Sequence, residues 1–153
     1  MTERLVCASE AQTLALGMAL GQAAFPGMVV CLNGPLGAGK TVLTRGLARG
    51  LGYAGRISSP TYQLVAIYEE GRLPLWHADL YRLSEGADLQ DLALDLADEG
   101  VLVVEWAERS PKELPTDHLW VDLEILDQGR AVTLRASGAA HHAALERLGD
   151  LRR

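Results

Sequence analysis

Residues 34–41 read Gly-Pro-Leu-Gly-Ala-Gly-Lys-Thr and stand between an apolar run, MVVCLNG, and a helical pattern, TVLTRGLARGLG. Glycines at this spacing let backbone N–H groups curl around a phosphate, and the start of the following helix adds positive potential at the same point. The pattern G-x-x-x-x-G-K-[ST] between a strand and a helix is typical of phosphate-binding loops. This segment, the phosphate loop, therefore predicts an α/β fold that binds a nucleotide.

The phosphate loop also contains one of only two lysines in the chain, Lys40 and Lys112, against twelve arginines. A lysine ammonium is a compact point charge that reaches the β and γ phosphates, whereas a planar guanidinium does not fit the same hole. Thr41 would place its hydroxyl on Mg²⁺. The alternative is a glycine-rich turn without a ligand, and the strand and helix on either side of the loop disfavour it.

Helical and strand-like patterns alternate along the whole chain, and we expect one domain over residues 1–153. The pattern predicts helices over 9–25, 41–52 and 87–98 with a weaker one after Gly138, strands at 28–34 and 101–105, and antiparallel hairpins over 62–83 and 118–136. These elements predict an α/β, three-layer P-loop NTPase fold, with a mixed, mostly parallel central sheet and added antiparallel hairpins.

The composition places limits on the partners and the compartment. Twenty acidic against fourteen basic residues give a net charge of −6, which disfavours non-specific nucleic-acid binding by this chain alone. No apolar run is long enough for a membrane helix, and the first residues lack the apolar core of a signal peptide. We therefore expect a cytoplasmic protein in which Cys7 and Cys31 are buried free thiols. A disulfide between them is the alternative that a reducing cytosol disfavours.

Two carboxylates are candidates to complete a nucleotide site. VLVVE ends in Glu105 and LPLWHAD ends in Asp79, so each acid follows a run that predicts a strand. A P-loop ATPase needs a carboxylate near the metal at the end of a neighbouring buried strand. Glu105 is the first choice as a metal ligand, and Asp79 would orient the attacking water or the ligand shell of the Mg²⁺. The alternative for each is a solvated carboxylate at a strand end.

Other side chains near these strands have simpler interpretations. Trp106 follows Glu105, and core packing is the favoured role for a tryptophan on sequence alone. His77 is expected to be a satisfied strand residue, and His141 and His142 are expected to be solvated at the start of the terminal helix.

The stretch SPTYQ follows the helix after the phosphate loop, where nucleotide-sensing loops of P-loop proteins usually lie. Ser59 before Pro60 is held extended, and the hydroxyls of Thr61 and Tyr62 would face a γ-phosphate or a water molecule. A simple turn is the alternative. No N-K-x-D stretch is present to read guanine, so adenine is the expected base.

The motifs GPLGAGKT, SPTYQL, HADLYRL and VVEWAER, in this order, resemble those of the bacterial TsaE family over about residues 9–136. The resemblance implies ATP binding by the loop, a magnesium site at Thr41 and Glu105, catalytic importance for Lys40, Asp79 and Glu105, and a role in activity for Trp106. It implies a switch or partner loop at Ser59, Pro60, Thr61 and Tyr62. The implied nucleotide-binding residues are Ser9, Thr13, Gly37, Ala38, Gly39, Lys40, Thr41, Val42 and Arg130.

The same resemblance implies a magnesium-dependent ATPase with low turnover that works with the TsaB and TsaD proteins. Together they would form threonylcarbamoyladenosine (t6A) at position 37 of tRNAs that read codons beginning with A. The tRNA would be met only through the partners, which agrees with the acidic net charge. Two alternatives remain open: a small P-loop kinase for a metabolite, and a nucleotide sensor that binds partners without hydrolysis.

Overall fold

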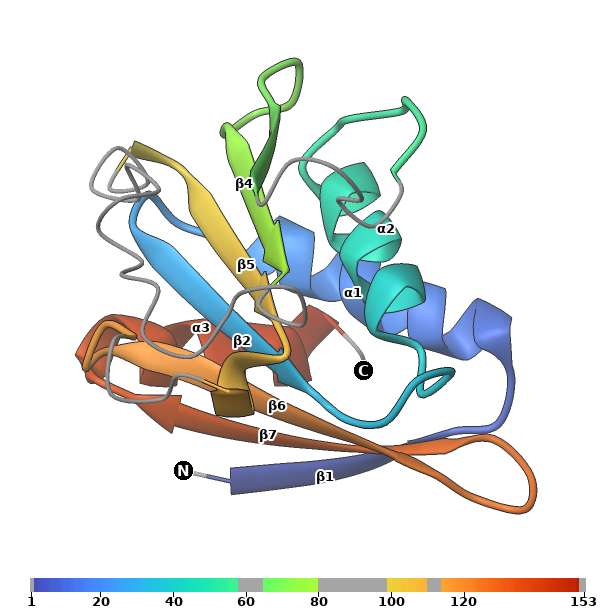
Figure 1. The fold of residues 1–153 in the computed structure, drawn as a ribbon. Helices are drawn as coiled ribbons and strands as arrows, with labels where there is room; N and C mark the ends of the chain where they lie inside the picture. Colours follow the sequence, from blue (N-terminus) through green and yellow to red (C-terminus); the bar gives the residue numbers. More distant parts are fainter. Residues whose placement is uncertain (1, 58–64, 80–98, 110–113, 152–153) are drawn as a thin grey trace.

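The computed structural model describes residues 2–57, 65–79, 99–109 and 114–151 of the chain. These residues form one seven-stranded sheet with the order β1-β7-β6-β2-β5-β4-β3 (Figure 1). The strands are β1 (Thr2–Cys7), β2 (Met28–Asn33), β3 (Val65–Tyr68), β4 (Leu75–Asp79), β5 (Val101–Glu105), β6 (His118–Ile125) and β7 (Arg130–Ser137). The helices are α1 (Glu10–Ala23), α2 (Lys40–Gly50) and α3 (Ala139–Leu151), with a 3₁₀ turn, η4, at Ala107–Arg109.

The sheet is mixed, with its parallel part at the centre. β2 pairs in parallel with both β5 and β6, and β4 pairs in parallel with β5. The pairs β3–β4, β6–β7 and β1–β7 are antiparallel, and the first two are the expected hairpins. The predicted α/β class with a mixed sheet and added hairpins is therefore confirmed. The sheet was expected to be mostly parallel, and three of the six strand pairs among the described residues are parallel.

Strand β1 is an element that the sequence pattern did not predict. Its polar residues Thr2, Glu3 and Arg4 gave no apolar run, and its side chains are only partly covered until Cys7. The strand forms because its backbone pairs with β7 over six residues, from Thr2 opposite Arg135 to Cys7 opposite Arg130. Backbone pairing at a sheet edge leaves little trace in side-chain hydrophobicity.

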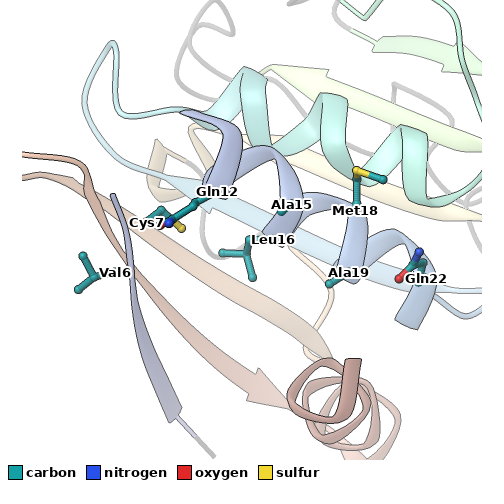
Figure 2. Close-up of a pocket in the computed structure, with 8 residues that line it drawn as sticks. All are labelled: Val6, Cys7, Gln12, Ala15, Leu16, Met18, Ala19 and Gln22. Atoms are coloured by element: carbon teal, nitrogen blue, oxygen red, sulfur yellow. The ribbon is translucent and has the colours of Figure 1, made fainter. Parts of the chain in front are cut away.

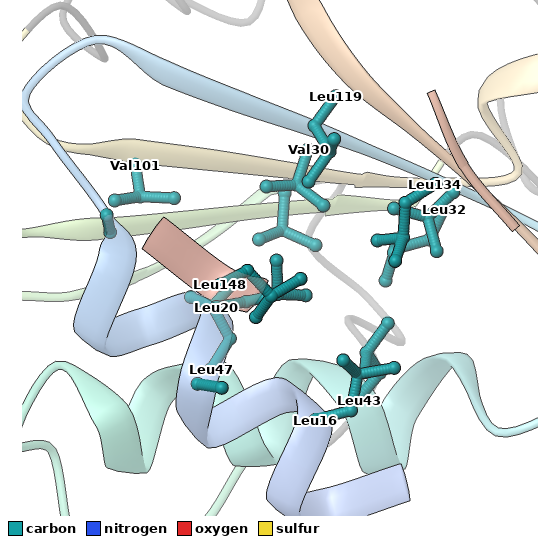
Figure 3. Close-up of a cluster of buried hydrophobic side chains, with 14 of the residues drawn as sticks. Leu16, Leu20, Val30, Leu32, Leu43, Leu47, Val101, Leu119, Leu134 and Leu148 are labelled. Atoms are coloured by element: carbon teal, nitrogen blue, oxygen red, sulfur yellow. The ribbon is translucent and has the colours of Figure 1, made fainter. Parts of the chain in front are cut away.

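The described helices all cover one face of the sheet. Alternate residues of β2 point to opposite faces, so Val30 and Leu32 join the large core beneath the helices, while Val29 and Cys31 join a smaller cluster on the other face. Figure 3 shows this core, in which leucines of α1, α2 and α3 meet the sheet residues. The predicted helix over 87–98 lies outside the described residues. No helix in the described part of the chain is long and apolar enough to cross a membrane.

Helices α1 and α2 meet through glycines. Gly17 and Gly21 on α1 face Gly46 and Gly50 on α2, and a Cβ added to Gly17 would lie 2.3 Å from the carbonyl oxygen of Leu43. An added Cβ at any of the four would come within 2.4 Å of a backbone oxygen of the facing helix. This glycine seam lets the two backbones touch. It also fixes the direction of α2, whose first residue is Lys40.

The start of α1 is held by two capping side chains. The Ser9 hydroxyl accepts a hydrogen bond from the Gln12 N–H at 3.2 Å, and Gln12 Oε1 accepts one from the Ala8 N–H at 2.6 Å. These bonds satisfy backbone donors that have no partner within the helix. They hold the turn between β1 and α1, in which Ser9 lies just before the helix that contains Thr13.

The histidine at the start of α3 was expected to be solvated, and that expectation is wrong for His141. Its side chain is buried, and Nε2 accepts a hydrogen bond from the Val29 N–H at 3.0 Å. Phe25 packs edge-on against the ring. Burial, and then His118, lower the pKa of His141, and Asp117 opposes them. The error arose because a polar helix start was taken to be solvated, whereas α3 packs this turn against β2 and the end of α1.

Both cysteines have the expected state. Cys7 and Cys31 are buried and free. Burial raises the pKa of the Cys31 thiol to about 12, so this thiol stays protonated and unreactive at neutral pH.

Candidate functional site

The carboxyl ends of β2, β5 and β4 lie side by side and form the floor of the candidate site. Their parallel register places Glu105 directly beside Leu32 of β2 and beside Asp79 of β4. The phosphate loop leaves the end of β2 and leads into α2 (Figure 1). Parallel strands therefore bring the two predicted carboxylates and the predicted loop to the same edge of the sheet.

The phosphate loop has the backbone conformation that its glycines predict. Gly37 has a φ of 80° and Gly39 a φ of 106°, in the left-handed region that favours glycine. Gly39 precedes the first helical residue of α2, and Ala38 is buried inside the loop. The first N–H groups of α2 and the loop backbone therefore lie where an anion would be bound.

Lys40 is buried at the centre of the loop. Its Nζ donates hydrogen bonds to the carbonyl oxygens of Gly34 and of Pro35, the latter at 3.1 Å, and lies 3.7 Å from the centre of the Trp106 ring. Burial lowers the pKa of Lys40, while Glu105, Glu108 and Asp79 partly oppose this effect. The ammonium is thus held by weak acceptors, with three carboxylates near enough to affect it, and an anion would be a stronger partner.

Trp106 has the packing role that the sequence favoured, and it also lies against Lys40. It is partly buried and packs against the smaller cluster of the sheet, as core packing requires. It also covers Lys40, and its φ of 60° makes it the one non-glycine residue with positive φ in the described part of the chain. A tryptophan pays for this conformation with about 1 kcal/mol or more of strain. Strain at this position is typical of a functional site.

Glu105 does not extend into solvent, which excludes the simplest alternative for it. The side chain is 3% exposed, and Oε2 contacts Nε2 of His77, which is fully buried on β4. His77 Nδ1 has no hydrogen-bond partner among the described residues. His77 lies within a strand as expected, but it is satisfied at one ring nitrogen only, the Nε2 that contacts the Glu105 carboxylate. Asp79 is also buried, two residues farther along the same strand.

Asn33 is a site residue that the sequence reasoning missed. Its Nδ2 donates to the carbonyl oxygens of Cys31 and Val121, both at 3.4 Å, and its Oδ1 accepts from the Glu108 N–H at 2.9 Å. The side chain therefore ties the end of β2 to the turn that follows Trp106. A polar residue at the end of an otherwise apolar strand was the available signal.

A cavity of about 220 Å³ opens beside the phosphate loop. It is lined by residues from distant parts of the chain. Four of them, in addition to the loop glycines, were predicted to bind the nucleotide: Ser9, Thr13, Val42 and Arg130. Arg130 donates a hydrogen bond to the carbonyl oxygen of Gly37 at 3.1 Å, which links the β6–β7 turn to the loop. The remaining lining residues are Ala8, Glu10, Gly37, Gly39 and Gly129.

A second, larger groove of about 530 Å³ lies between β1 and α1 (Figure 2). Val6 and Cys7 line it from the strand, and the helix contributes Gln12, Ala15, Leu16, Met18, Ala19 and Gln22. In the described part of the chain, no charged side chain and no residue of the phosphate loop is part of this lining. It is therefore not a candidate for binding phosphates.

The predicted switch residues Ser59, Pro60, Thr61 and Tyr62 lie outside the described residues. Within the described part of the chain, no three His, Cys, Asp or Glu side chains gather as a metal-binding group.

Comparisons with known proteins agree on one family. A sequence profile described as "Threonylcarbamoyl adenosine biosynthesis protein TsaE" matches residues 7–132. The tRNA threonylcarbamoyladenosine biosynthesis protein TsaE of Treponema pallidum is 41% identical, covering 86% of this chain and 98% of the relative, and that of Bacillus subtilis is 37% identical, covering 90% and 87%. The crystal structure of Bacillus subtilis YdiB superposes with a TM-score of 0.83 at 31% identity, covering 100% of this chain and 97% of that one. The chain therefore belongs to the TsaE family of tRNA threonylcarbamoyladenosine biosynthesis.

Proposed function

We propose that this protein binds and slowly hydrolyses ATP with Mg²⁺, as a subunit required for t6A formation in tRNA. The observation that carries the proposal is the surroundings of Lys40, a buried ammonium held by two loop carbonyls and influenced by the carboxylates of Glu105 and Asp79. The adjacent cavity has the location and size to admit part of a nucleoside. Membership of a tRNA-modification family favours this use of the loop.

The residues present fit a magnesium nucleotide. The Thr41 hydroxyl and the Glu105 carboxylate would hold Mg²⁺, which when bound would neutralise charge on the β and γ phosphates. Lys40 would leave the carbonyls of Gly34 and Pro35 and donate to those phosphates, while the backbone N–H groups of the loop stabilise the charge that develops. Asp79 would orient the attacking water. Ser9, Thr13, Val42 and Arg130 would surround the base and ribose beside the loop.

The proposed partners are the TsaB and TsaD proteins, with TsaD carrying out transfer to adenosine 37 of the tRNA. The charge of −6 supports an indirect relation to tRNA, because a subunit that acts on protein partners needs no extended basic face. ATP hydrolysis would then change the affinity of this chain for its partners.

The test is ATP hydrolysis by the purified protein, alone and with TsaB and TsaD, for wild type and the variants Lys40→Ala and Glu105→Ala. We expect slow hydrolysis that needs both residues and changes when the partners are added, together with t6A formation in the complete mixture. Phosphate release that requires a metabolite acceptor would instead support a kinase. Nucleotide binding without phosphate release in any mixture would support a sensor.

A further inference from the structure

Three arginine side chains line one groove on the outer side of the phosphate-loop helix. Arg45 and Arg49 lie one turn apart on α2, and Arg56 lies in the segment after this helix. The groove has a volume of about 560 Å³, and its lining is completed by Thr41, Ala54, Gly55 and Ile57. Among the described residues, no acidic side chain is part of this lining. This arginine groove is thus a local concentration of positive charge on a chain with a net charge of −6.

These arginines differ from most others in the described part of the chain, which are held by the protein itself. Arg72, Arg130, Arg135 and Arg147 each donate a hydrogen bond to a carbonyl or carboxylate oxygen. Among the described residues, Arg45, Arg49 and Arg56 have no hydrogen-bond or ion-pair partner. Each guanidinium offers five N–H donors in a planar fork that matches carboxylate or phosphate oxygens. Three such groups in one groove are therefore available to an external anion.

We propose that the arginine groove binds an acidic segment of a partner protein. A short segment with a few glutamates or aspartates brings its charges only to the groove, where each carboxylate can accept paired hydrogen bonds from a guanidinium. A nucleic acid has negative charge along its whole backbone, so its phosphates beyond the groove would approach the rest of a protein with net negative charge. That charge repels them over about 10 Å at 0.1 M salt. Three cations also neutralise too few phosphates to offset that repulsion.

The position of the groove connects partner binding to the nucleotide site. Thr41 lines the groove and is also the last residue of the phosphate loop, and Arg45 lies one turn farther along the same helix. A segment bound in the groove would lie against the helix that carries Lys40. This connection rests on the proposed function, whereas binding of the segment itself can be measured without any hydrolysis.

The experiment follows the side-chain Nε–Hε NMR signals of the arginines in ¹⁵N-labelled protein during titration with a hexaglutamate peptide at low salt. We expect the signals of Arg45, Arg49 and Arg56 to shift together and to saturate, while that of Arg4, an exposed arginine on β1, stays in place. The double variant Arg45→Gln/Arg49→Gln should bind the peptide at least about tenfold more weakly, because it loses two charge-assisted partners. Arg4→Gln is the matched control and should bind as wild type does.

Three results would overturn the proposal. Equal shifts of Arg4 and the groove arginines would show non-specific attraction, and tighter binding of an RNA hexanucleotide than of hexaglutamate would assign the groove to a nucleic acid. A full response of the three arginines to Mg·ATP alone would make the groove part of the nucleotide site. Saturable peptide binding in a protein that does not hydrolyse ATP would support the groove and contradict only the proposed function.

Discussion

The glycine seam between α1 and α2 and the polar cluster at the carboxyl ends of β2, β4 and β5 are packed by opposite means. At the seam, side chains are absent and backbone meets backbone. In the cluster, Lys40, His77, Asp79 and Glu105 are all buried although burying charge is costly. The seam thus has no group that could perform chemistry, while the cluster contains groups that packing alone does not require. We expect changes at the seam to affect stability and changes in the cluster to affect activity.

The largest expected effect is on stability, from Gly46→Ala in the seam. The added Cβ would lie 2.3 Å from the Leu14 carbonyl oxygen, so the helices must separate and the free energy of unfolding should fall by about 3 kcal/mol. Urea unfolding followed by circular dichroism measures it. Gly149→Ala in α3 is the matched control, because its Cβ would meet nothing within 4 Å and the helix should gain about 0.5–1 kcal/mol. Similar stabilities for the two variants would contradict the account of the seam.

Lys40→Met should produce the reverse pattern, a loss of activity without a loss of stability. We expect ATP hydrolysis to fall by about 100-fold or more because the charge aimed at the phosphates is lost. The unfolding free energy should stay the same or rise, because the cost of burying an ammonium is removed. Phosphate release and urea unfolding on one preparation measure both quantities. A large loss of stability would show that Lys40 is needed for the fold instead.

A smaller effect is expected at His77, which contacts Glu105 without reaching the phosphate loop. His77→Gln should lower kcat for ATP hydrolysis by about tenfold with little change in KM, since the carboxylate would lose the group that orients it. Steady-state kinetics measures kcat and KM separately. His118→Gln, at the start of β6, is the control and should leave both constants unchanged. An equal change in KM would indicate a role in binding rather than in positioning.

The smallest effect concerns pH and the buried His141, which lies outside the polar cluster. Its pKa is lowered in the folded state, so the unfolded chain binds the proton more readily and stability should fall as the pH drops below about 6.5. The slope from this one group cannot exceed about 1.4 kcal/mol per pH unit. His141→Gln should flatten the dependence between pH 5 and pH 7, and urea unfolding across that range measures it. The control His142→Gln should keep the wild-type slope.

How much the sequence predicted differs between the loop and its surroundings. Residues 34–41 were recognisable because every fixed position of the pattern carries a local backbone or charge requirement. Glu105 and Asp79 were found because each ends an apolar run, and the parallel register then brings them together. The local sequence pattern and the position at a strand end were sufficient to select these residues as candidates.

What escaped prediction depends on contacts between distant segments. Strand β1 forms because it pairs with β7. Asn33 belongs to the site because its side chain accepts a hydrogen bond from the Glu108 N–H, and His141 is buried where it accepts one from the Val29 N–H. The seam was missed for a related reason. Glycines at 17, 21, 46 and 50 look neutral until two helices are known to face each other. Periodicity describes one element at a time and contains no information on such pairs.

The most direct test of the proposed site is calorimetric titration of ATP into wild type and Glu105→Gln, each with Mg²⁺ and with EDTA. We predict that Mg²⁺ tightens ATP binding to wild type by about tenfold, or 1.4 kcal/mol, and that Glu105→Gln still binds ATP but loses this gain. Binding to wild type that is indifferent to Mg²⁺, or an unchanged gain in Glu105→Gln, would contradict the assignment of Glu105 to the metal.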